Sequence, residues 1–480
     1  MRLESKTRHN NLIVPNPLPD SFLFGVATSD HQGEAFDPAR PDIWDVWERK
    51  TKRTPRGRGT DFWHRFEEDI LLAAGLGCKV FRFSIAWARV EPKPGHYDEA
   101  AFEHYRRVIQ TIRNAGMQPL ITLCHWVYPL HIQARGGLVA PGFPETFAVY
   151  ARAVAERLGK DCGFWLSFNE PNVMLQGYFK PWNAFETSLP PGLGDDDSLE
   201  RQVALIGRLI PNLFKAHSLA RNELQKVNPE ARVSANPLLT GLPSYLQWLL
   251  DWRVTHTRDL EHLRRIQKLV TPEPVRHANG TPRKKPVRGW RRFVTILRLV
   301  LTGANSNWWH LGMAGKLPEF LCPKECIGQH DFVGLDHYWG VKDSQPWKIA
   351  DLLEAGTGRF DLAPVNPQIL FRTLKKLSRM FPNQDIFIIE NGSVKNGLLE
   401  PGEYLRRHVL EVQRAVSAGI RVIGYLYWSI TSNSEWGLKF APSNDFGLYH
   451  VALDSDPKLE RHKTNTADDY QKIIKDRGIV

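Results

Sequence analysis

Short apolar runs recur along the chain and alternate with longer amphipathic, charged segments. Eight of the apolar runs predict β-strands, at residues 22–29, 80–87, 119–126, 164–170, 232–236, 331–338, 386–391 and 422–429. The segments between them, such as 141–160 and 401–418, have the periodicity of amphipathic helices. Nearly continuous apolar strands that alternate with helices indicate a parallel sheet covered on both faces. Eight such units predict an α/β fold, a single (β/α)8 barrel with extended loops.

Polar side chains gather where these predicted strands end. One run reads FWLSFNEP and leads to Glu170, and another reads IFIIENG and carries Glu390. Four further strand-end residues are His125, Asn169, Tyr338 and Trp428. In an eight-fold barrel the carboxyl ends of the strands form the active-site face. Because an unpaired buried charge is costly, we expect the two glutamates to share one site, and paired carboxylates are the chemistry of glycoside hydrolysis.

Composition limits the class of protein. The 480 residues are 42% hydrophobic and 24% charged, as in soluble globular proteins. The 16 Trp, 24 Phe and 12 Tyr suit the binding of sugar rings, although a large core also contains such residues. No apolar stretch reaches the roughly 18 residues that span a bilayer, and the N-terminus lacks the pattern of a signal peptide. Five cysteines without a tight spacing motif argue against zinc, so we expect reduced thiols and a cytoplasmic location.

A basic segment lies between the fifth and sixth predicted strands. The chain has a net charge of +11, and residues 276–298 contain eight Lys or Arg and no Asp or Glu. Together with its flanks, at 270–305, this segment is a basic amphipathic insertion into the barrel. Its helical pattern places Arg288, Arg291 and Arg292 opposite an apolar face.

Alternative readings of this insertion stay open. One is a barrel helix with a solvated basic face. Another is a surface that lies on an anionic membrane or a glycolipid through Arg288, Arg291 and Arg292, which would make the protein peripheral to a membrane. Contact with nucleic acid is not expected, because no nucleic-acid-binding motif accompanies the charge.

In their order and spacing, the motifs resemble those of glycoside hydrolase family 1, the retaining β-glycosidases, over nearly the whole chain, 1–480. The family's acid/base motif appears as SFNEP at 167–171 and its nucleophile motif as IIENG at 388–392. Further matching stretches are ATSDHQGE (27–34), DIWDVW (42–47), EEDILLAAGLGCKVFRFSIAWARVEP (67–92), LCHWVYPL (123–130), DFVGLDHY (331–338) and YLYWSITSNSEW (425–436). The resemblance implies one barrel domain.

The resemblance also implies roles for individual residues. Glu390 would be the nucleophile and Glu170 the acid/base residue of a retaining mechanism. Tyr338 and Arg82 would support the nucleophile. The residues that would bind the terminal sugar are Gln32, His125, Asn169, Tyr338, Trp428, Glu435 and Trp436. Neither a metal nor an organic cofactor is implied, and the substrate would be a small-molecule glycoside.

Departures from the family pattern bear on the site. Asp336 and His337 stand where the family has Asn and Tyr, and Ser434 stands where it has Phe. An ionised Asp cannot donate a hydrogen bond as Asn does, and an extra anion beside two carboxylates raises their proton affinity. The effect of Asp336 on acid/base tuning is therefore open. The pair Glu435-Trp436 is kept, which favours a sugar without phosphate.

The predicted function is that of a retaining β-glycosidase, which hydrolyses terminal, non-reducing β-linked glucosyl, galactosyl or fucosyl residues through a glycosyl-enzyme. One alternative is a transglycosidase that uses the same two glutamates to deliver the sugar to a lipid or sugar acceptor. Another is a catalytically silent barrel that binds glycosides, although silent relatives usually lose a catalytic carboxylate and this chain keeps both. The choice among the three sugars, the aglycone and the oligomeric state stay open.

Overall fold

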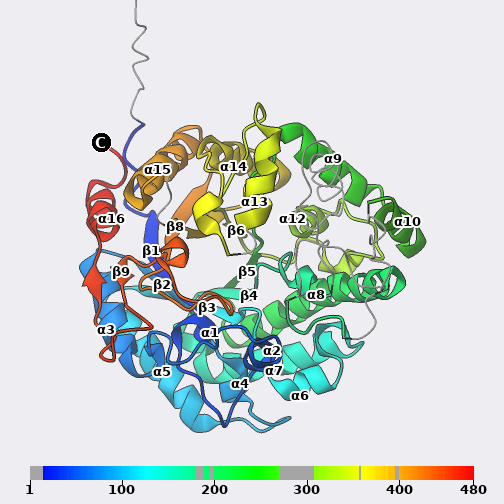
Figure 1. Ribbon diagram of the computed structural model, residues 1–480, viewed down its shortest axis with the longest axis horizontal. Helices are drawn as coiled ribbons and strands as arrows, with labels where there is room; N and C mark the ends of the chain where they lie inside the picture. Colours follow the sequence, from blue (N-terminus) through cyan, green and yellow to red (C-terminus); the bar gives the residue numbers. More distant parts are fainter. Residues whose placement is uncertain (1–14, 179–188, 195–197, 271–306, 356–357, 395–398) are drawn as a thin grey trace, which may run out of the picture.

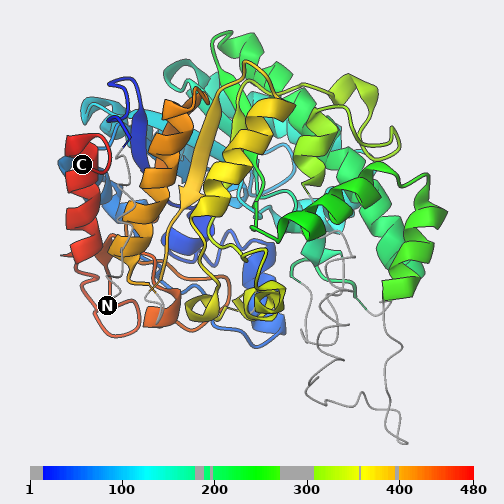
Figure 2. The same ribbon diagram turned by 90° about the horizontal axis from the view of Figure 1, so that it is seen from above.

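The computed structural model describes residues 15–178, 189–194, 198–270, 307–355, 358–394 and 399–480. Its centre is an eight-stranded parallel sheet that curls into a barrel, and helices surround this sheet (Figure 1 and Figure 2). All eight predicted strands are present, so the predicted (β/α)8 fold is confirmed.

The order of the strands in the sheet is that of a barrel, in which the first and last strands are neighbours. The strands are β1 (Leu23–Ala27), β2 (Val80–Ser84), β3 (Gln118–Cys124), β4 (Phe164–Asn169), β5 (Arg232–Asn236), β6 (Val333–Asp336), β7 (Ile386–Asn391) and β8 (Val422–Trp428). They pair in the order β5-β4-β3-β2-β1-β8-β7-β6. The circle closes between β5 and β6, where the N–H of Leu239 donates to the carbonyl of Asp336 (2.8 Å) and the N–H of Asp336 donates to that of Pro237 (3.1 Å).

Helices follow the strands and cover the outside of the barrel. They are α1 (Asp30–Gly33), α2 (Ile43–Lys50), α3 (Phe62–Gly75), α4 (Trp87–Val90), α5 (Glu99–Asn114), α6 (Leu130–Ala134), α7 (Phe143–Leu158), α8 (Leu199–Val227), α9 (Ser244–Thr255), α10 (Leu260–Val270), α12 (Trp308–Met313), α13 (Ile349–Ala355), α14 (Gln368–Met380), α15 (Pro401–Ser417) and α16 (Asn465–Asp476). The helices predicted at 141–160 and 401–418 are α7 and α15. A short antiparallel pair after β8, β9 (Tyr449–His450) with β10 (His462–Lys463), was not predicted.

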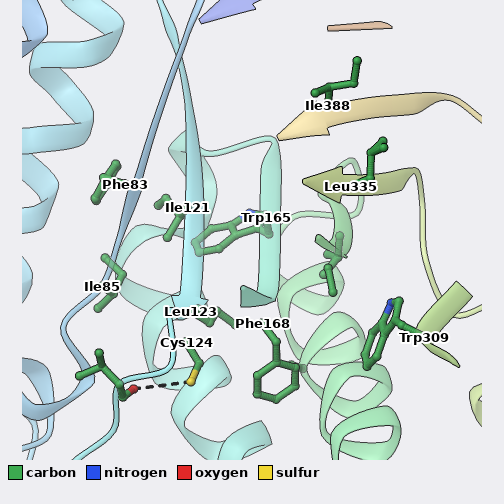
Figure 3. Packing of buried hydrophobic residues seen from close by; sticks show 14 of the residues in the cluster. Phe83, Ile85, Ile121, Leu123, Cys124, Trp165, Phe168, Trp309, Leu335 and Ile388 are labelled. Carbon is green, nitrogen blue, oxygen red and sulfur yellow. Dashed lines mark hydrogen bonds between the residues drawn. The ribbon is translucent and has the colours of Figure 1, made fainter. Parts of the chain in front are cut away.

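The outward faces of the strands pack against the helices. Figure 3 shows part of this layer around β3 and β4, where buried side chains such as Ile121, Leu123 and Trp165 lie together. The indole N–H of Trp165 donates to the carbonyl of Cys162 (3.1 Å), so the large ring is buried without an unsatisfied polar group. These contacts hold the strands, and with them the positions of their carboxyl ends.

The inside of the barrel is filled by a second apolar cluster, whose members precede the polar or aromatic strand-end residues in sequence. Its members are Val80, Leu120, Phe164, Leu166, Phe332, Phe387, Ile389 and Leu426. The ring centroids of Phe164 and Phe387 are 5.9 Å apart, although they belong to β4 and β7, which are not neighbours in the sheet. The two rings therefore meet across the interior. This plug leaves the carboxyl ends of the strands for polar side chains, where barrel enzymes carry their sites.

Two expectations concern membranes. Among the residues that the structure describes, no helix is long and apolar enough to cross a bilayer. The basic insertion at 270–305, with Arg288, Arg291 and Arg292, lies outside the described residues apart from Val270 at the end of α10.

Candidate active site

An irregularity in β7 decides which way Glu390 points. Residues of a regular strand alternate between two faces, and on β7 the interior cluster contains Phe387 and Ile389. Regular alternation would therefore turn Glu390 away from the interior. The register between β7 and its neighbours shifts at this point, as in a β-bulge. As a result, Glu390 faces the interior and pairs with Arg82 of β2.

The strand β4 has a similar irregularity. Leu166 belongs to the interior cluster, whereas the hydroxyl of Ser167 lies 2.7 Å from Nδ1 of His217 on the covering helix α8. A register shift between Leu166 and Asn169 then turns Asn169 inward. Glu170 follows with a φ of +38°, a left-handed backbone conformation that is strained for a residue with a side chain. Backbone strain thus lies at the predicted acid/base residue.

The two predicted glutamates meet at the carboxyl ends of their strands, and Asp336 of β6 lies beside them. One oxygen from each of Glu170, Asp336 and Glu390 is within 4.8 Å of the others. All three side chains are buried. Carboxyl groups this close together are compatible with the separation of roughly 5–5.5 Å in retaining glycosidases.

Glu390 accepts hydrogen bonds at both of its oxygens. The guanidinium of Arg82 donates to Oε1, and the phenol of Tyr338 donates to Oε2 at 2.6 Å. Burial, and next the negative charge of Glu390, raise the pKa of Tyr338 well above its ordinary 10, so the phenol keeps the proton that it donates. Charge-assisted bonds of this kind stabilise a carboxylate and fix its orientation.

Glu170 lies in a different electrostatic environment. Burial raises the pKa of Glu170 well above its ordinary 4.5, the charge of Glu390 raises it further, and Arg82 acts in the opposite direction. Burial and the charge of Glu390 both favour the protonated form of Glu170. Two neighbouring carboxyls whose environments separate their protonation states are suited to one acidic and one nucleophilic or basic role.

Arg82 also organises the side chains next to Glu390. Its Nη2 donates to Oδ1 of Asn169 at 2.6 Å, and the same oxygen accepts from the amide of Asn236 of β5, also at 2.6 Å. The NH2 group of Asn169 is therefore the end that remains for a ligand. Burial, and next the charge of Arg82, lower the pKa of His125 well below 6.5, so this imidazole is neutral.

A second polar group lies at Glu435. Its Oε1 accepts hydrogen bonds from the amides of Gln32 (3.1 Å) and Asn433 (2.6 Å). The hydroxyl of Ser29 donates to Oε1 of Gln32 at 2.8 Å, which sets the orientation of that amide. Burial raises the pKa of Glu435 to about 8, although the bond from Asn433 lowers it. The group offers buried donors and acceptors of the kind that bind sugar hydroxyls.

An aromatic wall connects these polar groups. The rings around the half-buried Trp436 belong to Trp44 (4.4 Å between centroids), Trp126 (4.6 Å), His31 (5.5 Å) and His125 (5.7 Å). Trp428, at the end of β8, lies 5.8 Å from His125. The aromatic wall thus runs from His125, after β3, to the polar group around Glu435. The predicted site residues therefore form one connected set.

Two clusters have the donor atoms to hold a metal ion. One is Glu170, Asp336 and Glu390, and the other is His31, Asp45 and Glu48. Burial lowers the pKa of His31, but its interactions with Asp42 and Glu48 outweigh burial and raise the pKa to about 9. A protonated imidazole does not bind a metal, and in the first cluster the Arg82 guanidinium already bonds to Glu390. In both clusters, part of the donor set therefore already bonds to protein groups.

Comparison with known proteins identifies the family. The model of glycosyl hydrolase family 1 matches residues 14–241 and 357–479. The chain belongs to glycosyl hydrolase family 1. The resemblance drawn from the motifs is confirmed, and this family 1 protein is a glycoside hydrolase, an enzyme that hydrolyses O-glycosyl bonds. The strand β6, which ends at Asp336, and Tyr338 after it lie between the two matched parts.

Relatives with assigned names are similar along nearly the whole chain of this glycosidase. Beta-glucosidase A of Thermotoga maritima is 25% identical over 491 residues, which cover 96% of this chain and 98% of that protein. A bifunctional beta-D-glucosidase/beta-D-fucosidase of Bifidobacterium breve is 28% identical, over 96% of this chain and 98% of the relative. The solved structure of the T. maritima beta-glucosidase in complex with deoxynojirimycin has a TM-score of 0.70 at 21% identity and covers 97% of this chain and 100% of that one.

Sequence reasoning missed several residues of the site. Asn236 closes the run RVSAN, so the criterion of a polar residue at a strand end would have selected it. Trp44, Trp126 and His31 lie in stretches that matched the family, but a core aromatic and a site aromatic look alike in sequence. Their place in the wall depends on segments that follow β1 and β3 and that meet Trp436 in the segment after β8.

Proposed function

We propose that this family 1 enzyme is a retaining β-glycosidase that removes terminal, non-reducing β-linked glucose, galactose or fucose, with Glu390 as the nucleophile and Glu170 as the acid/base residue. The observation that carries the proposal is the difference between the two carboxyls: Glu390 accepts hydrogen bonds from Arg82 and Tyr338, while burial and the charge of Glu390 raise the pKa of Glu170. A nucleophile must be ionised and a general acid protonated before the reaction starts.

In the first step, an oxygen of Glu390 attacks C1 of the bound sugar. Glu170 donates its proton to the glycosidic oxygen, the C1–O bond breaks, and the aglycone leaves as an alcohol. The product is a glycosyl ester of Glu390. After burial, the charge of Glu390 is the largest cause that raises the pKa of Glu170. Because this charge disappears in the ester, the ionised form of Glu170 becomes more stable, and Glu170 can act as a base.

In the second step, Glu170 accepts a proton from water, and the water oxygen attacks C1. The ester bond to Glu390 breaks, and the sugar leaves with the configuration that it had in the substrate. The proton on Glu170 and the negative charge on Glu390 are both restored. Arg82 and Tyr338 then again bond to the carboxylate.

The surrounding residues support recognition of the sugar. Asn169 would donate to the 2-hydroxyl, Gln32 and Glu435 would bind the outer hydroxyls, and His125 would lie between them. Trp428 and Trp436 would offer ring faces to the apolar face of the pyranose. The residues of this proposed subsite are Gln32, His125, Asn169, Tyr338, Trp428, Glu435 and Trp436.

Aryl glycosides test this function. The purified protein is expected to release nitrophenol from β-glucoside, β-galactoside or β-fucoside and not from the α-anomers. Proton NMR of early product should show the β-anomer first, because two displacements at C1 retain configuration. The α-anomer as first product, or release from α-substrates alone, would contradict the proposal.

Hydrolysis is the proposed reaction because the named relatives are glucosidases and fucosidases. The transglycosidase and the silent binder, which the sequence left open, receive no specific support. Adding a competing alcohol to the same assay separates transfer from hydrolysis by the ratio of new glycoside to free sugar.

The second part of the proposal is contact with an anionic membrane or a glycolipid through Arg288, Arg291 and Arg292. A feature of α9 supports it, because three aromatic side chains lie on one face of this helix and are exposed. They are Tyr245 (50% exposed), Trp248 (65%) and Trp252 (48%). Tyr and Trp favour the boundary between membrane and water. In Figure 1, α9 and α10 lie at the outer rim of the barrel, and the basic insertion follows α10 in sequence.

Vesicle sedimentation tests this contact. The protein is expected to pellet with phosphatidylglycerol vesicles, and pelleting should fall at least about threefold when Arg288, Arg291 and Arg292 become Glu, since each basic residue contributes on the order of 1 kcal/mol. Replacing Trp248 and Trp252 with Ser should also reduce pelleting with the vesicles.

The matched control reverses three exposed charges elsewhere, Arg106→Glu, Arg113→Glu and Lys160→Glu, on and near α5 and α7. Equal loss in this control would mean that net charge alone drives binding. Equal pelleting of wild type and the Arg288/Arg291/Arg292 variant would contradict the contact.

The proposal includes a reducing, cytoplasmic location. The five cysteines, all in the described part of the chain, are buried and unpaired. Burial raises the pKa of Cys78, Cys124 and Cys162, so these thiols are protonated and unreactive. Such thiols are typical of reducing compartments, and cell fractionation with a thiol-labelling reagent tests the location.

A further inference from the structure

Asp336 is a third carboxyl in the catalytic centre. It is the last residue of β6 and is fully buried at the seam where the barrel closes. Its Oδ2 accepts a hydrogen bond from the amide of Asn236 at 2.6 Å. Its Oδ1 is buried and has no hydrogen-bond partner among the described residues. An ionised carboxylate with one such oxygen would carry an unsatisfied buried charge, which is costly.

The charges around Asp336 make ionisation costlier still. The titratable and charged groups that face it are Glu390 of β7, Glu170 after β4, Arg82 of β2 and Tyr338 after β6. Within the described residues, Arg82 is the one cation of this set, and it donates directly to Glu390. Three ionised carboxyls would leave two negative charges without compensation in a buried pocket, where screening is weak. Two protons shared among the three carboxyls remove this excess.

We propose that Asp336 is a positioning residue that works as a neutral carboxylic acid with its proton on Oδ1, in a cluster where one of its oxygens lies within 4.8 Å of an oxygen of Glu170 and of Glu390. A protonated Asp has one O–H donor and keeps acceptor capacity. Oδ2 then accepts from Asn236, and Oδ1, which accepts from no described residue, is the oxygen that carries the proton. The inference deepens the proposed function, and its consequence for catalysis rests on that function.

The neutral acid keeps the charge of the pocket constant through the reaction. Before attack, Glu390 balances Arg82. In the glycosyl-enzyme, Glu390 is an ester and Glu170, which has given up its proton, balances Arg82 instead. Because Asp336 stays neutral in both states, neither step creates a second buried anion. Burial raises the pKa of Asp336 well above 3.8, and the charges of Glu390 and Glu170 raise it further.

Infrared spectroscopy tests the proton on Asp336 without any substrate. The wild type minus Asp336→Asn difference spectrum at pH 7 is expected to contain the carbonyl stretch of a protonated carboxylic acid. Asn has the same shape and keeps an oxygen for the bond from Asn236, so the variant should fold, and its thermal unfolding checks this. Asp343→Asn is the matched control, since Asp343 is exposed and pairs with Arg372 (2.9 Å), and its spectrum should show the loss of an ionised carboxylate.

The pH profile provides a second readout. The alkaline limb of kcat/KM for an aryl β-glycoside is expected to lie within about 0.5 pH unit of wild type in Asp336→Asn, because one neutral group replaces another. Removing an anion next to Glu170 would instead lower that limb by about 1 pH unit or more. Such a drop, or the loss of a carboxylate band in place of the acid band, would overturn the inference.

A bound cation is the competing way to balance the three carboxyls. The infrared and kinetic measurements are therefore repeated after EDTA treatment and with added Mg²⁺ or Ca²⁺. Bands and rates that depend on the cation would overturn the inference, and unchanged ones support it. If the wild type releases no aglycone from any glycoside, the proposed function fails, but the infrared result still decides whether Asp336 is protonated.

Discussion

The Glu390→Gln variant is expected to lose aryl-β-glycosidase activity by on the order of 10⁴-fold or more. The amide cannot attack C1, so the glycosyl-enzyme does not form. The substitution removes the carboxylate that accepts hydrogen bonds from Arg82 and Tyr338. The volume of the side chain stays nearly the same. The measurement is the initial rate of nitrophenol release under saturating β-glycoside, with a covalent label at residue 390 in the wild type after trapping with a fluorinated glycoside.

The control for this variant is Glu67→Gln, an exposed glutamate on α3 that should retain wild-type rates. The thermal unfolding temperature of Glu390→Gln should lie below that of wild type, since the buried Arg82 loses its ionised partner. Activity within tenfold of wild type, in a folded Glu390→Gln protein, would mean that another group is the nucleophile.

The Glu170→Ala variant is expected to show an effect that depends on the leaving group. Rates with alkyl glycosides should fall by about 10²–10⁴-fold, because the departing oxygen is not protonated. A dinitrophenyl glycoside needs no acid, so its first step should stay fast and the glycosyl-enzyme should accumulate as a burst. The alkaline limb of the wild-type profile reflects loss of the Glu170 proton, since its pKa is raised, and this limb should vanish in the variant.

Azide distinguishes the two glutamates in a single experiment. In Glu170→Ala, azide enters where the base was, attacks the glycosyl-enzyme and should restore turnover with a β-glycosyl azide as product. In a Glu390→Ala protein, azide attacks the substrate itself and should give the α-glycosyl azide. The reverse pattern would exchange the two roles, and no rescue in either variant would argue against both.

The strands of the barrel could be predicted from sequence because each is buried on both faces. A parallel strand between a packed interior and a helical layer is apolar at every position, and runs such as IFII before Glu390 stand out. The glutamates stood out for the same reason, as ionisable residues at the ends of such runs. Their nearness followed from the rule that strand carboxyl ends meet on one face.

The directions of the side chains could not be predicted. Continuous apolar strands carry no alternation from which to read the inward face, so the register shifts at Ile389 and before Asn169 left no trace in the sequence. The contacts of Asp336 were equally hidden, because they cross the seam to Asn236 and the interior to Glu170. A replacement of Asn by Asp was visible, but its protonation depends on burial and on partners that only the fold assembles.

The closure of the barrel between β5 and β6, and the pairing of β1 with β8, have a consequence for how the enzyme folds. Leu23 of β1 lies opposite Gly424 of β8, Arg82 and Glu390 are 308 residues apart, and Gln32 and Glu435 are 403 apart. Contacts between such distant residues form late, because a long loop must close first. A nascent chain therefore has no working site until its last strand docks. The rate at which activity returns during refolding would therefore report the step in which β8 pairs with β1 and closes the barrel. It would not report the earlier collapse of the chain.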